Sequence, residues 1–168
     1  MLKWAPMTDK DPAADFELVA TNRVAYHEYF ILDKYEAGIV LKGTEVKSLR
    51  AKHCQLKDAH ARVDRSGNME LMNFHINPYE MGNRYNMDPT RSRRLLMHQR
   101  EIDKLAFALA TKGVTIVPLR VYFKKGRAKV ELGLAKGKQA HDKRQSVKEK
   151  EADREVSREM RNRNRYND

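Results

Sequence analysis

The chain has 168 residues, a length that suits one domain with some chain left over for a tail. Its 34 Lys and Arg against 23 Asp and Glu give a formal net charge of +11 at pH 7, which favours a polyanionic partner. No run approaches the roughly 20 apolar residues of a membrane-spanning helix, and the start lacks the apolar stretch of a secretory signal. The single Cys54 excludes an intramolecular disulfide and a cysteine-based zinc site, so we expect a cytoplasmic protein without a membrane partner.

The first third of the chain predicts a leader, two strands and a short helix. Residues 1–20 are rich in Pro and Asp and predict a flexible leader. Residues 24–33 and 35–43 are rich in β-branched and aromatic residues, and they predict two strands with a break near Asp33 and Lys34. A helix is expected from Thr44 through Arg50, because Thr44 is a favourable N-cap.

The middle of the chain predicts a hairpin, a basic loop and a second helix. Residues 59–65 and 69–76 flank a Ser-Gly-Asn turn, in which glycine permits the positive φ of a tight hairpin. Residues 79–94 are polar and become basic, which predicts a surface loop, and Asp88-Pro89 within it has the residue types of a helix start. Residues 99–112 carry apolar side chains at helical spacing, and Gly113 can end that helix.

The last part of the chain predicts another hairpin and then a tail. Residues 114–123 and 129–135 read as strands around a turn at 124–127, with Pro118 at an edge or bulge position. Residues 136–168 have few large apolar side chains and many charges, so they cannot bury enough surface to fold alone. The predicted organisation is a leader at 1–20, a body at 21–135 and a disordered, helix-prone basic tail at 136–168.

The sequence contains no recognisable catalytic or metal-binding motif. Its six histidines lack the spacing that places two imidazoles on one helix face, and no phosphate-binding loop or nucleophile motif is present. Cys54 is interpreted as a small hydrophobic residue beside the first helix. We therefore expect a protein that is not an enzyme and that carries no metal or cofactor.

Basic residues instead cluster beside aromatic ones. Arginine offers a planar fork for phosphate and a flat face for bases, so such clusters are typical of nucleic-acid binding in small β-barrels. The first cluster follows Tyr79 and Tyr85 and contains Arg84, Arg91, Arg93, Arg94 and Arg100; the second surrounds Tyr122 and Phe123 and contains Arg120, Lys124, Lys125, Arg127 and Lys129.

Several longer strings resemble one family, the transfer-messenger RNA (tmRNA) binding proteins of bacterial ribosome rescue called SmpB. The strings follow the family's order and span residues 22–148 almost completely. They are HEYFI at 27–31, EAGIVLKGTEVKSLR at 36–50, DPTRSRRLL at 88–96, REI at 100–102, VELGLAKGK at 130–138 and HDKR at 141–144.

The resemblance implies an OB-type antiparallel β-barrel with two or three embedded helices. It implies an adaptor that binds the tRNA-like domain of tmRNA and delivers it to stalled ribosomes for trans-translation, with elongation factor Tu in the delivery complex. The tail would enter the vacant mRNA channel near the decoding region of the small subunit and fold there as a helix. A general single-stranded nucleic-acid-binding or ribosomal protein is the alternative.

The resemblance also implies roles for particular residues. From the sequence alone, Glu36 is an ordinary strand acid and Leu96 a core residue. Lys52 stands where the family usually has glycine, which implies either a strained left-handed helix end or a different turn. The implied RNA-face residues are Asn22, Glu36 and Leu96, with Arg91, Arg93 and Arg94 as RNA backbone contacts, and the implied ribosome-binding tail residues are Lys138, His141, Asp142, Lys143 and Arg144.

Overall fold

The computed structural model describes residues 16–139, 142, 151, 154–156, 158 and 160. The elements of the first half are β1 (Phe16–Thr21), α1 (Arg23–Glu28), β2 (Tyr29–Ile39), α2 (Gly43–Arg50), β3 (Cys54–Gln55), β4 (His60–Val63) and β5 (Met69–Met72). Those of the second half are β6 (His75–Ile76), the 3₁₀ helix η1 (Glu80–Tyr85), β7 (Arg93–Leu96), α3 (Gln99–Leu109), β8 (Val114–Lys124) and β9 (Arg127–Gly137).

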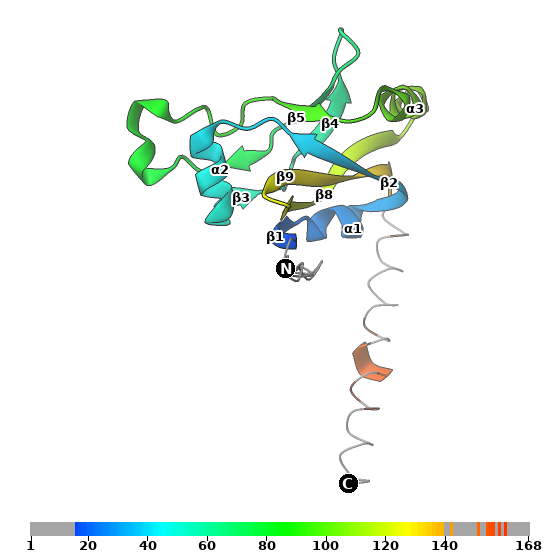
Figure 1. Ribbon diagram of the computed structural model, residues 1–168. Helices are drawn as coiled ribbons and strands as arrows, with labels where there is room; N and C mark the ends of the chain where they lie inside the picture. Colours follow the sequence, from blue (N-terminus) through cyan, green and yellow to red (C-terminus); the bar gives the residue numbers. More distant parts are fainter. Residues whose placement is uncertain are drawn as a thin grey trace, which may run out of the picture.

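The main sheet is antiparallel and closes on itself. Its strands follow the order β1-β8-β4-β5-β7-β2-β9, and β8 also pairs with β9 along its whole length, so the strands from β8 round to β9 form a closed barrel. β1 and β4 share the second edge of β8, β1 along Arg120–Lys124 and β4 at Ile116. Figure 1 shows this arrangement with α1, α2 and α3 packed around it. The prediction of a mainly β, antiparallel barrel with embedded helices is confirmed.

The interior of the barrel is filled by aliphatic and aromatic side chains. α2 contributes Leu49, and α3 contributes Ile102 and Leu105, the residues at helical spacing in the sequence. Phe74 and Leu132 are completely buried in the same cluster. Burial of such side chains is the main favourable contribution to folding, at roughly 1.5 to 3 kcal/mol for each large one.

The first strand region differs from the prediction. Residues 29–39 form one strand rather than two separated at Asp33, and the pairing with β9 shifts register between Ile31 and Asp33. The polar pair marks this bulge, which lets the strand bend without ending. Residues 24–28, expected to be extended, lie in α1, and residues 16–20, assigned to the leader, lie in β1.

The later elements mostly follow the prediction. The helices at 44–50 and 99–112, the hairpins β4–β5 and β8–β9, and the bulge at Pro118 are confirmed, although α3 ends at Leu109. The strand expected at 69–76 is shorter: β5 ends at Met72, and His75–Ile76 form β6, which pairs with β3 in a separate two-stranded sheet. The expected helix start at Asp88 is wrong: its carboxylate accepts hydrogen bonds from the backbone and hydroxyl of Thr90, which form a turn leading into β7. β9 continues to Gly137, so the boundary expected at residue 136 falls inside a strand.

The end of α2 adopts the left-handed turn that the Lys52 position implied. The backbone N–H of His53 donates to the carbonyl of Ser48 (3.0 Å), and that of Lys52 donates to Leu49 (2.9 Å). These two hydrogen bonds require the residue after the C-cap to adopt a left-handed backbone conformation. That residue is Lys52, which follows the C-cap Ala51 and has a φ of 60°. A side chain at this position strains the backbone, whereas glycine does not.

We therefore expect Lys52→Gly to raise the free energy of unfolding by about 1 kcal/mol, measured by urea denaturation. Lys57→Gly is the matched control: Lys57 is also exposed but is not among the residues with positive φ, so glycine there should lower stability. A Lys52→Gly variant no more stable than the parent would show that this turn stores no strain.

Candidate nucleic-acid interface

A charged patch covers the outer face of the barrel where β2, β9 and β8 lie side by side. Alternation along β2 turns Tyr35 and Ala37 towards the core and Glu36 outward. The pairing of Lys129 with Gly38 on one side and with Tyr122 on the other brings three strands together here. We call this surface the Glu36 face; it consists of Glu36, Gly38, Leu96, Tyr122, Lys124 and Lys129.

Glu36 organises the cations of this face. Its Oε1 accepts a hydrogen bond from Lys129 Nζ (2.5 Å), and its Oε2 accepts bonds from the Tyr122 hydroxyl (2.5 Å) and Lys124 Nζ (3.3 Å). Hydrogen bonds from Lys129 and Tyr122 lower the pKa of the Glu36 carboxyl to about 2. Glu36 is therefore ionised at neutral pH and holds two ammonium groups at fixed positions, each with further donors available to a ligand.

Leu96 lies beside this charged group. It pairs with Gly38 across β2 and β7, and a Cβ added to Gly38 would lie 3.3 Å from the Leu96 Cβ, so glycine allows the close approach. Leu96 is 56% exposed, contrary to the core position that its residue type alone indicated. A cavity of about 470 Å³ is lined by Glu36, Leu96 and Lys129 together. The structure thus brings together two of the three residues predicted for the RNA face.

The arginines of residues 91–94 are divided between surface and interior. In β7, Arg93 and Leu95 point inward while Arg94 and Leu96 point outward. Arg93 is 0% exposed, so the prediction that it contacts an RNA backbone is wrong. Arg94 is exposed and donates to Asn68 Oδ1 (2.7 Å), which leaves its guanidinium on the surface.

Arg93 and Arg91 instead converge on a buried carboxylate of α2. Glu45 Oε1 accepts from Arg93 Nε (2.9 Å) and Arg91 Nε (2.9 Å), and its Oε2 accepts from Arg91 Nη2 (2.5 Å). Burial opposes ionisation of Glu45, but the bonds from Arg91 and from the Lys42 backbone outweigh it and keep the pKa below its ordinary value. Arg93 also donates to the carbonyls of Phe74, Arg91 and Pro89, so its fork binds β7 and the preceding loop to α2.

Asn22 also has an internal role. Its Oδ1 accepts from the backbone of Ala25 and so caps α1, and its Nδ2 donates to the carbonyls of Leu56 (3.2 Å) and Pro118 (3.1 Å). Asn22 is only 8% exposed and both of its amide hydrogens are used. These hydrogen bonds position α1 against β8, and a direct RNA contact of Asn22 stays a prediction.

The described part of the tail starts from a defined point. The backbone N–H of Lys138 donates to Glu28 (2.8 Å), and its ammonium lies 4.8 Å from the Phe30 ring centre. Asp142 accepts a bond from the Gln139 backbone. The other three residues predicted to act in the tail, His141, Lys143 and Arg144, lie outside the described residues. The described residues between 151 and 160 are helical and exposed.

Tyr122, Lys124 and Lys129 were recognised in the sequence as part of a basic and aromatic cluster, but not as partners of Glu36. The contacts join residues 86 to 93 positions apart, and sequence spacing does not report such pairs. Burial raises the pKa of the Cys54 thiol to about 11, in agreement with its interpretation as a small hydrophobic residue. Within the described residues, no cluster of metal-ligating side chains occurs and no helix is long and apolar enough to cross a membrane.

A closed antiparallel barrel with a basic face that combines fixed lysines and an exposed leucine defines a small nucleic-acid-binding protein. The chain belongs to the SmpB protein family, whose model matches residues 19–162. It is 54% identical over 147 residues to the SsrA-binding protein of Syntrophotalea carbinolica, with 88% of this chain and 97% of that protein covered. The SsrA-binding protein of Bacillus cereus ATCC 14579 is 55% identical over 152 residues, with 90% and 97% covered.

A solved structure described as "tmRNA-SmpB: a journey to the center of the bacterial ribosome" contains a similar chain. The two are 51% identical and superpose with a TM-score of 0.62 over 72% of this chain and 85% of that one. The family resemblance inferred from the sequence strings is therefore confirmed.

We expect Glu45→Gln to lower the free energy of unfolding by about 3 kcal/mol, because it leaves the buried Arg93 guanidinium without its counter-charge. The matched control is Glu70→Gln, which breaks the exposed pair of Glu70 with Arg62 (3.4 Å) and should cost less than about 1 kcal/mol. Urea denaturation of both variants gives the comparison; equal losses would contradict a structural role for the Glu45 pair.

Proposed function

We propose that the protein is an RNA-binding adaptor that binds the tRNA-like domain of tmRNA and delivers it to stalled ribosomes for trans-translation. Family membership supports this, together with relatives of more than 50% identity named SsrA-binding proteins and a similar chain described with tmRNA and the ribosome. The structural observation that carries the proposal is the Glu36 face, where two lysines are fixed by one carboxylate beside an exposed leucine.

The Glu36 face suits RNA for physical reasons. Lys124 and Lys129 outnumber Glu36, so the group has a net positive charge and attracts phosphate although it contains a carboxylate. Holding the ammonium groups in place reduces the side-chain entropy lost on binding. Leu96 supplies an apolar surface for a ribose or base, and the Glu36 oxygens can accept hydrogen bonds from ribose or base N–H and O–H groups.

In this proposal the protein supplies binding and positioning and no catalytic group. The barrel, with β1 included and the leader shortened accordingly, carries the RNA, and the segment after Lys138 reaches the decoding region and the mRNA channel of the small subunit. His141, Asp142, Lys143 and Arg144 would act there. The resemblance to the SmpB family also supports elongation factor Tu as a partner during delivery.

We expect binding to the tRNA-like domain to depend on salt through the Glu36 face. Replacing Lys124 and Lys129 by Gln should flatten the slope of log affinity against log salt by about 1.5 units, at roughly 0.7 to 0.9 per phosphate contact. Glu36→Ala should weaken binding with little change in slope, because the lysines remain but lose their fixed positions. Filter binding or fluorescence anisotropy at several salt concentrations measures both effects.

The control for this experiment removes the same charge elsewhere, by replacing Lys104 on α3 and Lys112 just beyond it by Gln; both are exposed. This control should keep the parent slope. Equal slopes for all variants would remove the Glu36 face from the RNA contact, and equal affinity for the tRNA-like domain and for mixed single-stranded RNA would favour a general nucleic-acid-binding protein instead.

The tail should be dispensable for RNA binding and essential for tagging. Truncation after Gln139 preserves β9 and the Lys138 contact, so affinity for the isolated tRNA-like domain should stay within about twofold while peptide tagging on stalled ribosomes is lost. Replacing Asp142, Lys143 and Arg144 together by Ala tests the same segment at full length. Retention of tagging by the truncated protein would contradict entry of the tail into the channel, and loss of both functions would place the tail in the primary RNA site.

A further inference from the structure

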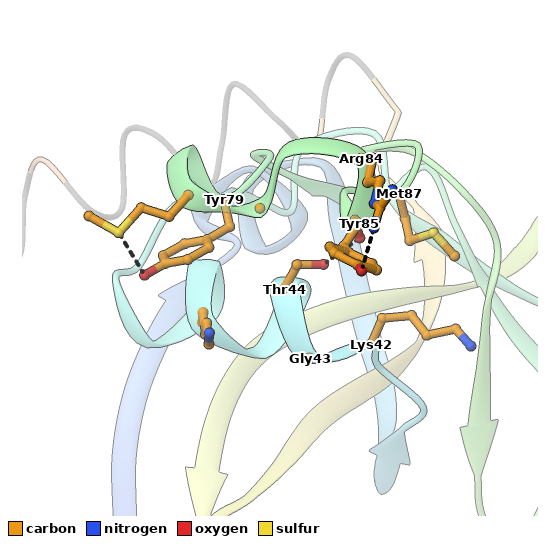
Figure 2. A pocket seen from close by; sticks show the side chains of 10 residues that line it. Lys42, Gly43, Thr44, Tyr79, Arg84, Tyr85 and Met87 are labelled. Carbon is orange, nitrogen blue, oxygen red and sulfur yellow. Dashed lines mark hydrogen bonds between the residues drawn. The ribbon is translucent and has the colours of Figure 1, made fainter.

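A second hollow lies between the start of α2 and the loop that contains η1. Its volume is about 620 Å³. Figure 2 shows Tyr79 and Tyr85 of the loop above Gly43 and Thr44 of the helix. We call it the Tyr85 hollow; its lining includes Lys42, Lys47, Met81, Arg84, Tyr85 and Met87.

The loop over this hollow is held in one shape. The Asn86 side chain accepts from the Tyr79 backbone N–H (3.0 Å) and donates to its carbonyl (2.9 Å), which closes the loop at its base. A Cβ on Gly82 would overlap the Asn86 amide, so a larger residue there would displace that side chain from its two hydrogen bonds. The Thr44 hydroxyl donates to the Tyr85 carbonyl (3.2 Å) and ties the loop to α2. These hydrogen bonds, within the loop and to α2, therefore define the shape of the hollow.

This rigid loop directs apolar side chains towards solvent. Met81 is 82% exposed, Tyr85 68% and Met87 41%. Exposed apolar groups on a loop that hydrogen bonds hold in place contribute little to the stability of a monomer. Such a cluster indicates an interaction surface. A tyrosine ring and two polarisable thioethers are well suited to a flat aromatic ligand.

The charge of the hollow favours an anion on the same ligand. Lys42, Lys47 and Arg84 line it, and its lining residues within the described chain include no Asp or Glu. The Arg84 guanidinium lies 5.2 Å from the Tyr85 ring centre, and the Lys47 ammonium lies 5.2 Å from that of Tyr79. Glu45 on the same helix is occupied by Arg91 and Arg93. A basic rim around a stacking platform is the combination that binds single-stranded nucleic acid.

We propose that the Tyr85 hollow binds one unstacked nucleotide, with its base against Tyr85 and the two methionines and its flanking phosphates on Lys42 and Arg84. We assign that nucleotide to the RNA that binds the Glu36 face, so this part rests on the proposed function. The reason is continuity. A further cavity of about 420 Å³ contains Leu96 and Lys129 of the Glu36 face and is also lined by Leu41 and Val46. Lys42 and Lys47, their neighbours in the chain, line the Tyr85 hollow, so the two sites adjoin across the start of α2.

The test follows the methionine methyl groups by NMR in protein labelled with ¹³C-methyl methionine, with Met81 identified by Met81→Leu. Hexaadenylate should shift the signals of Met81 and Met87 through the ring current of a stacked base. An abasic hexanucleotide with the same phosphates should shift them much less. Met69, which is 0% exposed in the core, is the internal control.

Substitutions separate stacking from charge. Tyr85→Ala should weaken hexaadenylate binding about tenfold, and Tyr85→Phe should keep it within about twofold, because the ring carries the contact. Phe107→Ala is the matched control, since Phe107 is an exposed aromatic residue on α3 (84%) and should have no effect. Equal shifts with both hexanucleotides, or none with either, would overturn the proposal. Saturable shifts with an acidic methionine-containing peptide but not with RNA would indicate that the hollow binds a protein partner instead.

A final arm distinguishes this site from the Glu36 face. The tRNA-like domain should shift Met81 and Met87 in the parent, and Glu36→Ala should keep the shifts caused by hexaadenylate. Shifts with hexaadenylate but none with the tRNA-like domain would overturn the assignment to the shared RNA. Loss of tRNA-like domain affinity in Glu36→Ala, with the hexaadenylate shifts retained, is the result expected if both proposals hold.

Discussion

The ion pairs of Glu45 with Arg91 and Arg93 hold the Glu36 face and the Tyr85 hollow in a fixed relation to one another. The carboxylate belongs to α2 and the guanidinium groups to β7 and the turn before it, so the contact fixes the loop that leads into β7 against α2. Three residues after Arg93, the same strand presents Leu96 beside Gly38. Because a buried charge without a partner is strongly unfavourable, this contact defines a single position for the loop.

Carboxylates organise cations at three places on the barrel. Glu36 binds Lys124 and Lys129, Glu45 binds Arg91 and Arg93, and Glu131 binds Arg120 (2.5 Å) and Lys34 (3.3 Å). In a chain with a net charge of +11, uncompensated repulsion would spread the cations apart. Each acid instead gathers two of them while the local charge stays positive. At the Glu36 face, the carboxylate therefore supports the proposed anion binding by positioning Lys124 and Lys129.

The sequence correctly predicted helices and turns that depend on residues close to one another in the chain. Periodicity located α3 through Ile102 and Leu105, and the Ser-Gly-Asn turn located the β4–β5 hairpin. Other errors are local, at α1 and at the Asp88 turn, but two concern contacts between residues far apart in the sequence. Residues 16–20 follow a polar segment with the composition of a leader. They form a strand because they pair with the edge of β8, about 100 residues further along the chain. Arg93 belongs to a basic string, but the alternation of β7 turns it inward, where Glu45 neutralises it. The family resemblance placed Glu36 and Leu96 on a surface that composition alone did not reveal.

The hydrogen bond from the Lys138 backbone to Glu28 gives the C-terminal segment a fixed origin on the rigid barrel. A segment that starts from a fixed origin has a reach set by its residue count, about 1.5 Å for each residue in helical conformation. In any helical part of such a segment, one inserted residue would also rotate the side chains that follow it by about 100° around the helix axis. The length of such a segment and the direction in which its side chains point are therefore linked. Insertions or deletions of whole helical turns should be tolerated more readily than those of single residues.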